Sequence, residues 1–153
     1  MEKFSIKQGL KATVFLIGYF LTMELLGLGD NIWLRFLNAF ILFGGVYIAI
    51  RGWKKRKGGI PYFHGIAVGM ITSFTAAFVF SIFVITYLTY DTTLMQEINS
   101  MKIFRHEFTP VKAGLVIFFE ALFSGYLFSY TSLQILKNAI DTEQSMDNYN
   151  PSA

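Results

Sequence analysis

Four stretches of this chain each contain about twenty mostly apolar residues, the length that a helix needs to cross the hydrocarbon core of a bilayer. They run from about residue 10 to 28, 32 to 50, 66 to 90 and 113 to 136. A segment surrounded by lipid has no water to satisfy its backbone polar groups, so such a segment must be helical. The pattern therefore predicts an all-α integral membrane protein, with a single bundle of four transmembrane helices over residues 1–137.

The composition agrees with this class. Hydrophobic residues make up 54% of the chain and charged residues only 15%, whereas a soluble domain is about 25% charged. Phenylalanine occurs 17 times in 153 residues, more than a soluble core of this size can bury. The chain has no cysteine, which excludes disulfides, thiol catalysis and cysteine metal sites.

The lysine and arginine residues predict that both termini are cytoplasmic. With the N-terminus inside, nine of the thirteen lie on the cytoplasmic side: Lys3, Lys7, Lys11, Arg51, Lys54, Lys55, Arg56, Lys57 and Lys137. The other four are Arg35, Lys102, Arg105 and Lys112. This asymmetry is the positive-inside pattern of multi-pass proteins. The first apolar stretch is interpreted as a retained span, because Glu24 interrupts it and it is long for a signal peptide.

Residues 92–108 and 138–153 lie outside the predicted spans. Apolar residues recur at helical spacing over residues 92–108, at Leu94, Ile98, Met101, Phe104 and Phe108. This spacing predicts a short amphipathic helix in the outer interface. Residues 138–153 are polar and are interpreted as a cytoplasmic tail.

Small residues predict how the helices pack. Every fourth residue of the third span is small: Gly65, Gly69, Ser73, Ala77 and Ser81. The fourth span carries Ala121, Gly125 and Ser129 on a comparable face. Small residues let backbones approach closely, which is the main source of helix association in lipid. We expect these two faces to pack together, either within one chain or between two chains.

Polar residues inside the spans form the candidate site. Glu24 and Arg35 are expected at similar depths, Asn38 lies one turn further, and Glu120 lies about 12 Å beyond Lys112 at about 1.5 Å per residue. We predict an intramembrane cluster of Glu24, Arg35, Asn38 and Glu120. Intramembrane ionisable groups are costly and often functional. One interpretation is a set of paired groups that fixes helix register, and the other is a proton or cation site.

The basic stretch between the second and third spans predicts a lipid contact. Its cations are Arg51, Lys54, Lys55, Arg56 and Lys57. Cations beside a span favour anionic headgroups at the cytoplasmic surface, and Gly58-Gly59 is typical of a turn. No motif for catalysis, metal, cofactor or nucleic-acid binding is recognised. His64 and His106 are expected on opposite faces of the membrane, so they cannot share a metal ion.

Residues from about 46 to 91 resemble a known family. The run IAIRGWKKRKGG, followed by IPYFHGIAVGMITSFTAAFVFSIF and a polar segment, is similar to small four-span proteins of the domain of unknown function 4199 family, found mainly in Bacteroidota. The resemblance implies a four-span fold and a location in the bacterial inner membrane. It implies no site residues.

These observations together indicate a class of function. We expect a non-enzymatic structural or accessory component that packs with itself or with a larger membrane complex. The alternative is a small oligomeric transporter or channel, coupled to protons or cations through an intramembrane carboxylate.

Overall fold

The computed structural model is all-helical and describes residues 1–27, 32–58, 61–92, 96 and 109–147. Side chains are described for this part of the chain except at residues 32–35 and 138–147. The helices are α1 (Glu2–Leu25), α2 (Ile32–Lys57), α3 (Tyr62–Tyr90) and α5 (Pro110–Asp147). The predicted amphipathic segment 92–108 lies almost entirely outside the described residues.

Three of the four helices are long and apolar enough to cross a membrane. The qualifying segments are Phe36–Lys57, Tyr62–Tyr90 and Pro110–Lys137. The helix α1 does not reach this standard, because its apolar run between Lys11 and Glu24 is shorter than the roughly 20 residues of a full span. Helices of this composition are compatible with a membrane protein.

Three of the helices extend well beyond the predicted spans. The helix α1 begins at Glu2, and α2 continues through Lys54–Lys57, which form its last turn. Cations at this position interact favourably with the negative end of the helix dipole. Gly58 then has a φ of 70°, a left-handed conformation that glycine adopts without strain. At the other end of the chain, α5 runs past Lys137 to Asp147, so part of the predicted polar tail is helical.

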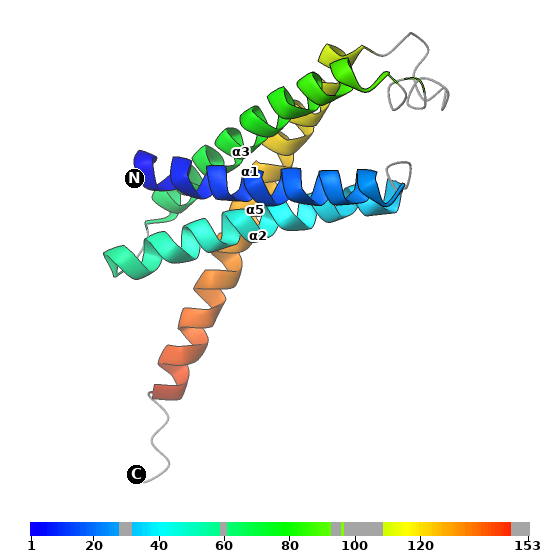
Figure 1. The fold of residues 1–153 in the computed structure, drawn as a ribbon. Coiled ribbons are helices and arrows are strands. Elements are labelled where there is room, and N and C mark those ends of the chain that lie inside the picture. The colour runs from blue at the N-terminus through cyan, green and yellow to red at the C-terminus, as the bar shows by residue number, and fades with distance from the viewer. Residues whose placement is uncertain (28–31, 59–60, 93–95, 97–108, 148–153) are drawn as a thin grey trace.

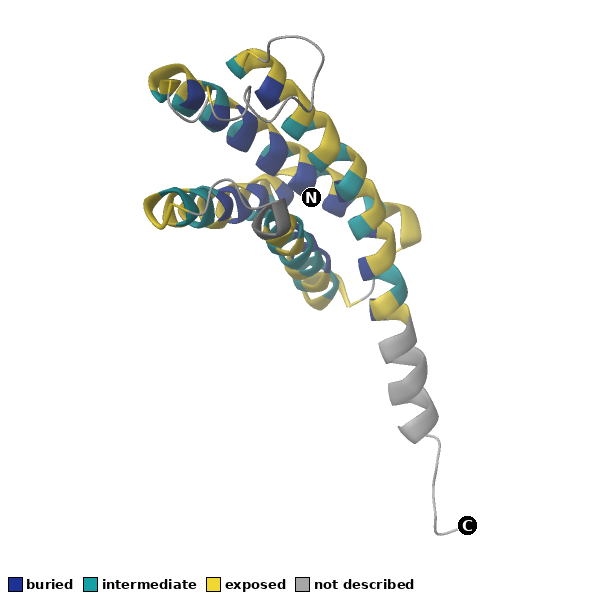
Figure 2. Cartoon of the chain, turned by 90° about the vertical axis from the view of Figure 1, so that its right-hand side faces the viewer, coloured by how far each residue is buried: buried dark blue, intermediate teal, exposed yellow. Residues whose placement is uncertain are grey.

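The helices are arranged as two pairs. Helices α1 and α2 run side by side in opposite directions, and α3 and α5 cross them as a second antiparallel pair (Figure 1). Helix α3 contacts α5 most extensively and α1 next. The C-terminal end of α5 extends past the other three helices (Figures 1 and 2). Helix α3 is therefore the central element of the bundle.

Apolar side chains fill two regions between the helices. The buried residues form stripes on the inward sides of the helices (Figure 2). One cluster joins all four helices and includes Leu16, Leu42, Phe80, Val84 and Ala113. The second lies nearer the C-terminal end of α2 and consists of Val46, Ala49, Ile50, Val68 and Leu136.

Small residues allow α3 and α5 to approach closely within one chain. A Cβ atom added at Gly69 would overlap the Ser129 side chain, and one at Gly125 would overlap Ser73. Near the other end of this contact, a Cβ at Gly114 would lie 3.2 Å from the Ser81 carbonyl oxygen. The predicted face on α3 (Gly65, Gly69, Ser73, Ala77 and Ser81) is buried throughout. On α5, Gly125 and Ser129 are buried, and Ala121 is half-buried.

Glycine also brings α1 close to its neighbours. A Cβ at Gly9 would lie 2.7 Å from the Thr72 carbonyl oxygen of α3, and one at Gly45 of α2 would lie 2.8 Å from the Ala12 Cβ. The Thr72 hydroxyl donates to the Val68 carbonyl at 2.8 Å and contacts the Ser5 carbonyl at 3.3 Å. Because its hydroxyl is satisfied, Thr72 can be buried without an unpaired donor.

Paired alanine substitutions test this packing. Gly44→Ala faces open space, so it should be neutral or should stabilise the helix by up to about 1 kcal/mol. Gly125→Ala must displace Ser73, and we expect it to lower the free energy of unfolding by about 1–3 kcal/mol, the usual cost of overpacking. Unfolding of both variants by titration with a denaturing detergent measures the difference. Equal stability of the two variants would contradict the close α3–α5 contact.

Candidate functional site

The four residues of the predicted polar cluster have different environments. Glu24 is half-buried on the last turn of α1. The side chain of Arg35 lies outside the described residues. The Asn38 Oδ1 atom is buried and, within the described part of the chain, has no hydrogen-bond partner. Glu120 is exposed on α5.

The position of Glu120 follows from the packing face of its helix. Ser129 is buried against Gly69, and Glu120 precedes it by nine residues. At about 100° per residue, nine residues amount to two and a half turns, which places Glu120 on the opposite side of α5. The structure therefore does not bring Glu120 into the interior of the bundle.

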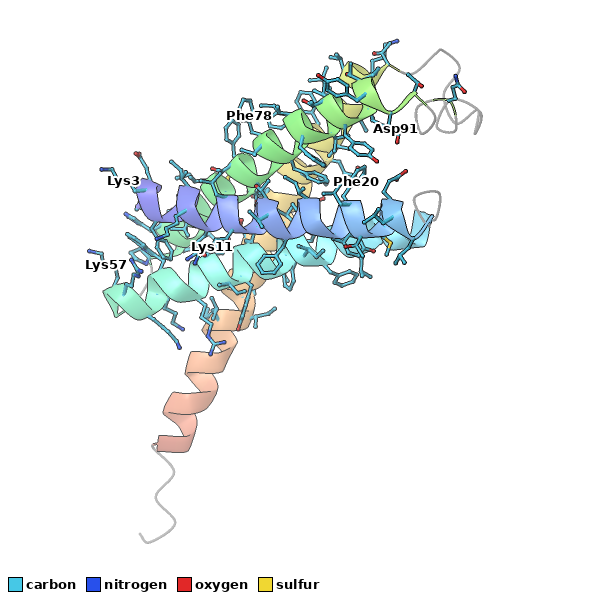
Figure 3. All side chains as sticks on the ribbon, viewed as in Figure 1. Lys3, Lys11, Phe20, Lys57, Phe78 and Asp91 are labelled. Atoms are coloured by element: carbon cyan, nitrogen blue, oxygen red, sulfur yellow. The ribbon has the colours of Figure 1, made fainter. Side chains whose placement is uncertain are left out.

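Glu24 lies in a second polar group that the sequence analysis did not identify. The Tyr87 side chain lies near the carboxylates of Glu24 and Asp91. These groups come from the ends of α1 and α3, at the end of the bundle where Asp91 is labelled (Figure 3). Phe80, Phe83 and Tyr87 recur at helical spacing on α3, and Asp91 follows at the same spacing as its C-terminal cap. This spacing is the sequence signal that could have predicted the group.

Aromatic rings hold this end of α1 against α3. The Phe20 ring lies 5.2 Å from that of Tyr87, 5.8 Å from Phe83 and 6.3 Å from Phe80, measured between centroids, and all three contacts are edge-to-face. Edge-to-face pairs contribute about 0.5–1.5 kcal/mol each beyond the burial of their area. Phe20 therefore fixes the position of Glu24, which lies one turn further along α1.

A shallow surface hollow adjoins this group. It is lined by Phe83, Thr86, Tyr87, Tyr90, Asp91 and Thr92. Aromatic and hydroxyl side chains of this kind are typical of the membrane–water interface. The hollow therefore lies at the end of α3 and has the composition of an interfacial region.

Cations gather at the opposite end of the bundle. The side chains of Lys3 and Lys57 extend from the same end (Figure 3). The Arg56 guanidinium lies 4.6 Å from the centroid of the Phe4 ring, and the Lys57 ammonium lies 5.9 Å from that of Trp53. The Lys54 ammonium donates a hydrogen bond of 3.2 Å to the Leu136 carbonyl oxygen. Arg51, Lys55, Arg56 and Lys57 are exposed, and Lys54 is half-buried.

Within the described part of the chain, no group of three or more His, Asp or Glu residues is close enough to hold a metal ion. His64 is exposed on the first turn of α3, and His106 lies outside the described residues.

Comparison with protein-family models, curated proteins and solved structures gives no match. The resemblance to the domain of unknown function 4199 family therefore stays a prediction.

The position of Glu24 depends on Phe20, and this can be measured with a matched pair of substitutions. Phe20→Ala removes three ring contacts, and we expect a loss of up to about 3 kcal/mol in the free energy of unfolding. Phe15 is on the same helix and is 71% exposed, so Phe15→Ala should have little effect. Denaturant titrations of both variants give the comparison, and a smaller loss for Phe20→Ala than for Phe15→Ala would refute the assignment.

Proposed function

We propose that this chain is a structural or accessory subunit of a larger membrane complex, and that it contacts this complex through the outward face of α5. The small-residue faces of α3 and α5 are occupied by each other within one chain, so they are not available to a partner. The outward face of α5 carries Glu120, an exposed ionisable residue that the span places at membrane depth.

The exposed position of Glu120 carries this proposal. At about 1.5 Å per residue, Glu120 lies about 12 Å from Lys112 and about 25 Å from Lys137. The helix between the two lysines is about 37 Å long at this rise, longer than a hydrocarbon core of about 30 Å, so a span between them places the carboxylate well below the membrane surface. An acidic residue near the centre of a span costs about 2.5–3.5 kcal/mol on insertion scales. A protein partner that covers Glu120 and bonds to it removes this cost.

The contacts of α1 support a fourth span. Its N-terminal half contacts α3 at Thr72 and its C-terminal half contacts α3 at Tyr87. Helix α1 therefore runs in the same direction as α3 and contacts it from Thr72 to Tyr87, within a helix that is itself apolar enough to span. We propose that α1 spans with it, which gives four spans with both termini on one side.

The charged end supports the proposed orientation. Cations from the start of α1 and the end of α2 lie at the same end of the bundle (Figure 3). By the positive-inside rule this end is cytoplasmic. We propose a location in the bacterial inner membrane, with the exposed cations in contact with anionic headgroups, each cation contributing about 1 kcal/mol.

Less support exists for the alternative function. This is a transporter or channel that is coupled to protons or cations through an intramembrane carboxylate. In the described structure, Glu120 faces outward, away from the packed interior of the bundle.

Cysteine labelling tests the four-span topology. The chain has no cysteine of its own, so single cysteines at Lys3, Thr92 and Lys137 report their positions without background. In spheroplasts, a membrane-impermeant maleimide should modify Thr92→Cys only, and permeabilisation should expose the other two. A topology in which only α2, α3 and α5 span predicts that Lys3→Cys reacts from outside, and this result would exclude the fourth span.

Native electrophoresis tests the accessory role. When the chain is extracted from its natural membrane in a mild detergent, we expect it to migrate with at least one other membrane protein. Treatment with a denaturing detergent should release the 17.4 kDa chain from that complex. Migration as a free monomer under all mild conditions would count against the proposal.

A further inference from the structure

The outward face of α5 contains a continuous seam of exposed residues: Val116, Glu120, Phe123, Leu127 and Tyr130. We propose that this seam binds one membrane-spanning helix of a different protein, and that this helix carries a lysine or arginine at the depth of Glu120. The inference rests on the proposed accessory function and adds the chemistry of the partner.

The geometry of the seam suits a helix. Its residues follow one another at intervals of four, three, four and three, so they lie along one side of α5. The apolar members are substantially exposed, from 45% for Tyr130 to 69% for Phe123. Residues at this spacing form the contact line of left-handed helix pairs that cross at about 20°, the commonest arrangement in membranes.

The chemistry of the seam requires a polar partner. Glu120 is flanked on this face by Val116 and Phe123, one turn away on either side, and among the described residues it has no hydrogen-bonding or ionic partner. In hydrocarbon, polar groups are stabilised only by protein groups or by trapped water. A helix that is apolar throughout would cover the seam but would leave the carboxylate unpaired.

Charge complementarity favours a basic partner over a second copy of this chain. The described lysine and arginine side chains lie at or beyond the ends of the apolar stretches, so they would not reach the depth of Glu120 in an adjacent copy. A two-fold axis through the seam would bring the two Glu120 carboxylates together, and like charges at short range oppose ionisation. A lysine or arginine of another protein instead neutralises the carboxylate directly.

Arginine fits the site better than lysine. Its guanidinium donates two parallel hydrogen bonds to a carboxylate and has further donors that require acceptors when buried. Ser124 lies one turn from Glu120 on α5 and is half-buried, so its hydroxyl is positioned beside the seam to accept one of these hydrogen bonds.

Site-specific photo-crosslinking identifies the occupant. A photoreactive amino acid is placed at Val116 or Phe123 in the full chain, in the cells that make it naturally. Matched positions at Phe15 on α1 and Phe40 on α2, which are 71% and 70% exposed, report contacts away from the seam. We expect a protein adduct from the seam positions only, and we expect its crosslinked peptide to come from a membrane-spanning helix with Lys or Arg within one turn.

Charge substitution then tests the ion pair. Glu120→Gln keeps the size of the side chain and removes its charge. Recovery of the crosslinked partner from mild detergent should then fall at least about tenfold, which corresponds to a loss of only about 1.4 kcal/mol in binding free energy. Glu2→Gln makes the same change at an exposed residue on α1 and should leave recovery unchanged. Glu120→Lys combined with Glu in place of the partner's cation should restore recovery. Equal amounts and equal stability of all variants in the membrane show that folding is unaffected.

Several results would overturn the inference. They are seam adducts with a second copy of this chain, adducts with lipid alone, a partner helix without a cation near the crosslink, and normal recovery with Glu120→Gln. A complex on native gels whose crosslinks come only from α1 or α2 would refute the seam and leave the accessory function standing. A chain that migrates alone would refute both.

Discussion

The bundle depends on the close approach of α3 and α5. In lipid, apolar side chains gain little by contacting one another rather than acyl chains, so helix association relies on close packing and polar contacts. Gly69 and Gly125 provide this packing, since each faces a serine of the other helix at a distance that leaves no room for a Cβ atom. The Ser129 hydroxyl donates to the Gly125 carbonyl of its own helix at 2.6 Å, so it is buried without an unpaired donor.

This contact also determines which residues face outward. Once Gly125 and Ser129 point toward α3, the rotation of α5 about its axis is fixed. Glu120 must then lie on the far side, among Val116, Phe123 and Leu127. The same small residues that stabilise the bundle therefore place a carboxylate on its outer surface. The internal packing and the proposed external contact are two consequences of one helix orientation.

The sequence was sufficient to predict the helical class and the apolar segments, because these depend on local composition. It was also sufficient to predict the small-residue faces, because small residues recur at every fourth position. The orientation of Glu120 could also have been predicted from the sequence. The predicted cluster was based on the depths of Glu24, Arg35 and Glu120 along their helix axes. It did not consider the direction in which each side chain points around its helix. The nine-residue separation of Glu120 and Ser129 supplies that direction for Glu120. The approach of Tyr87 to Glu24 was not predictable in this way, because it depends on how α1 crosses α3.

Helix α1 differs from α5, because its packing supports a span whereas its composition alone does not. Its apolar run is bounded by Lys11 and Glu24 and is too short to mark it as a span by hydropathy alone. Its contacts with α3 are close at both ends, through Gly9 and Thr72 near the start and Phe20 and Tyr87 near the end. In the proposed topology, α1 is held at membrane depth by protein contacts, whereas α5 is apolar enough to enter alone but exposes a charge. In the proposed topology and complex, the two helices thus have complementary requirements: α1 depends on α3, and α5 depends on a partner outside the chain.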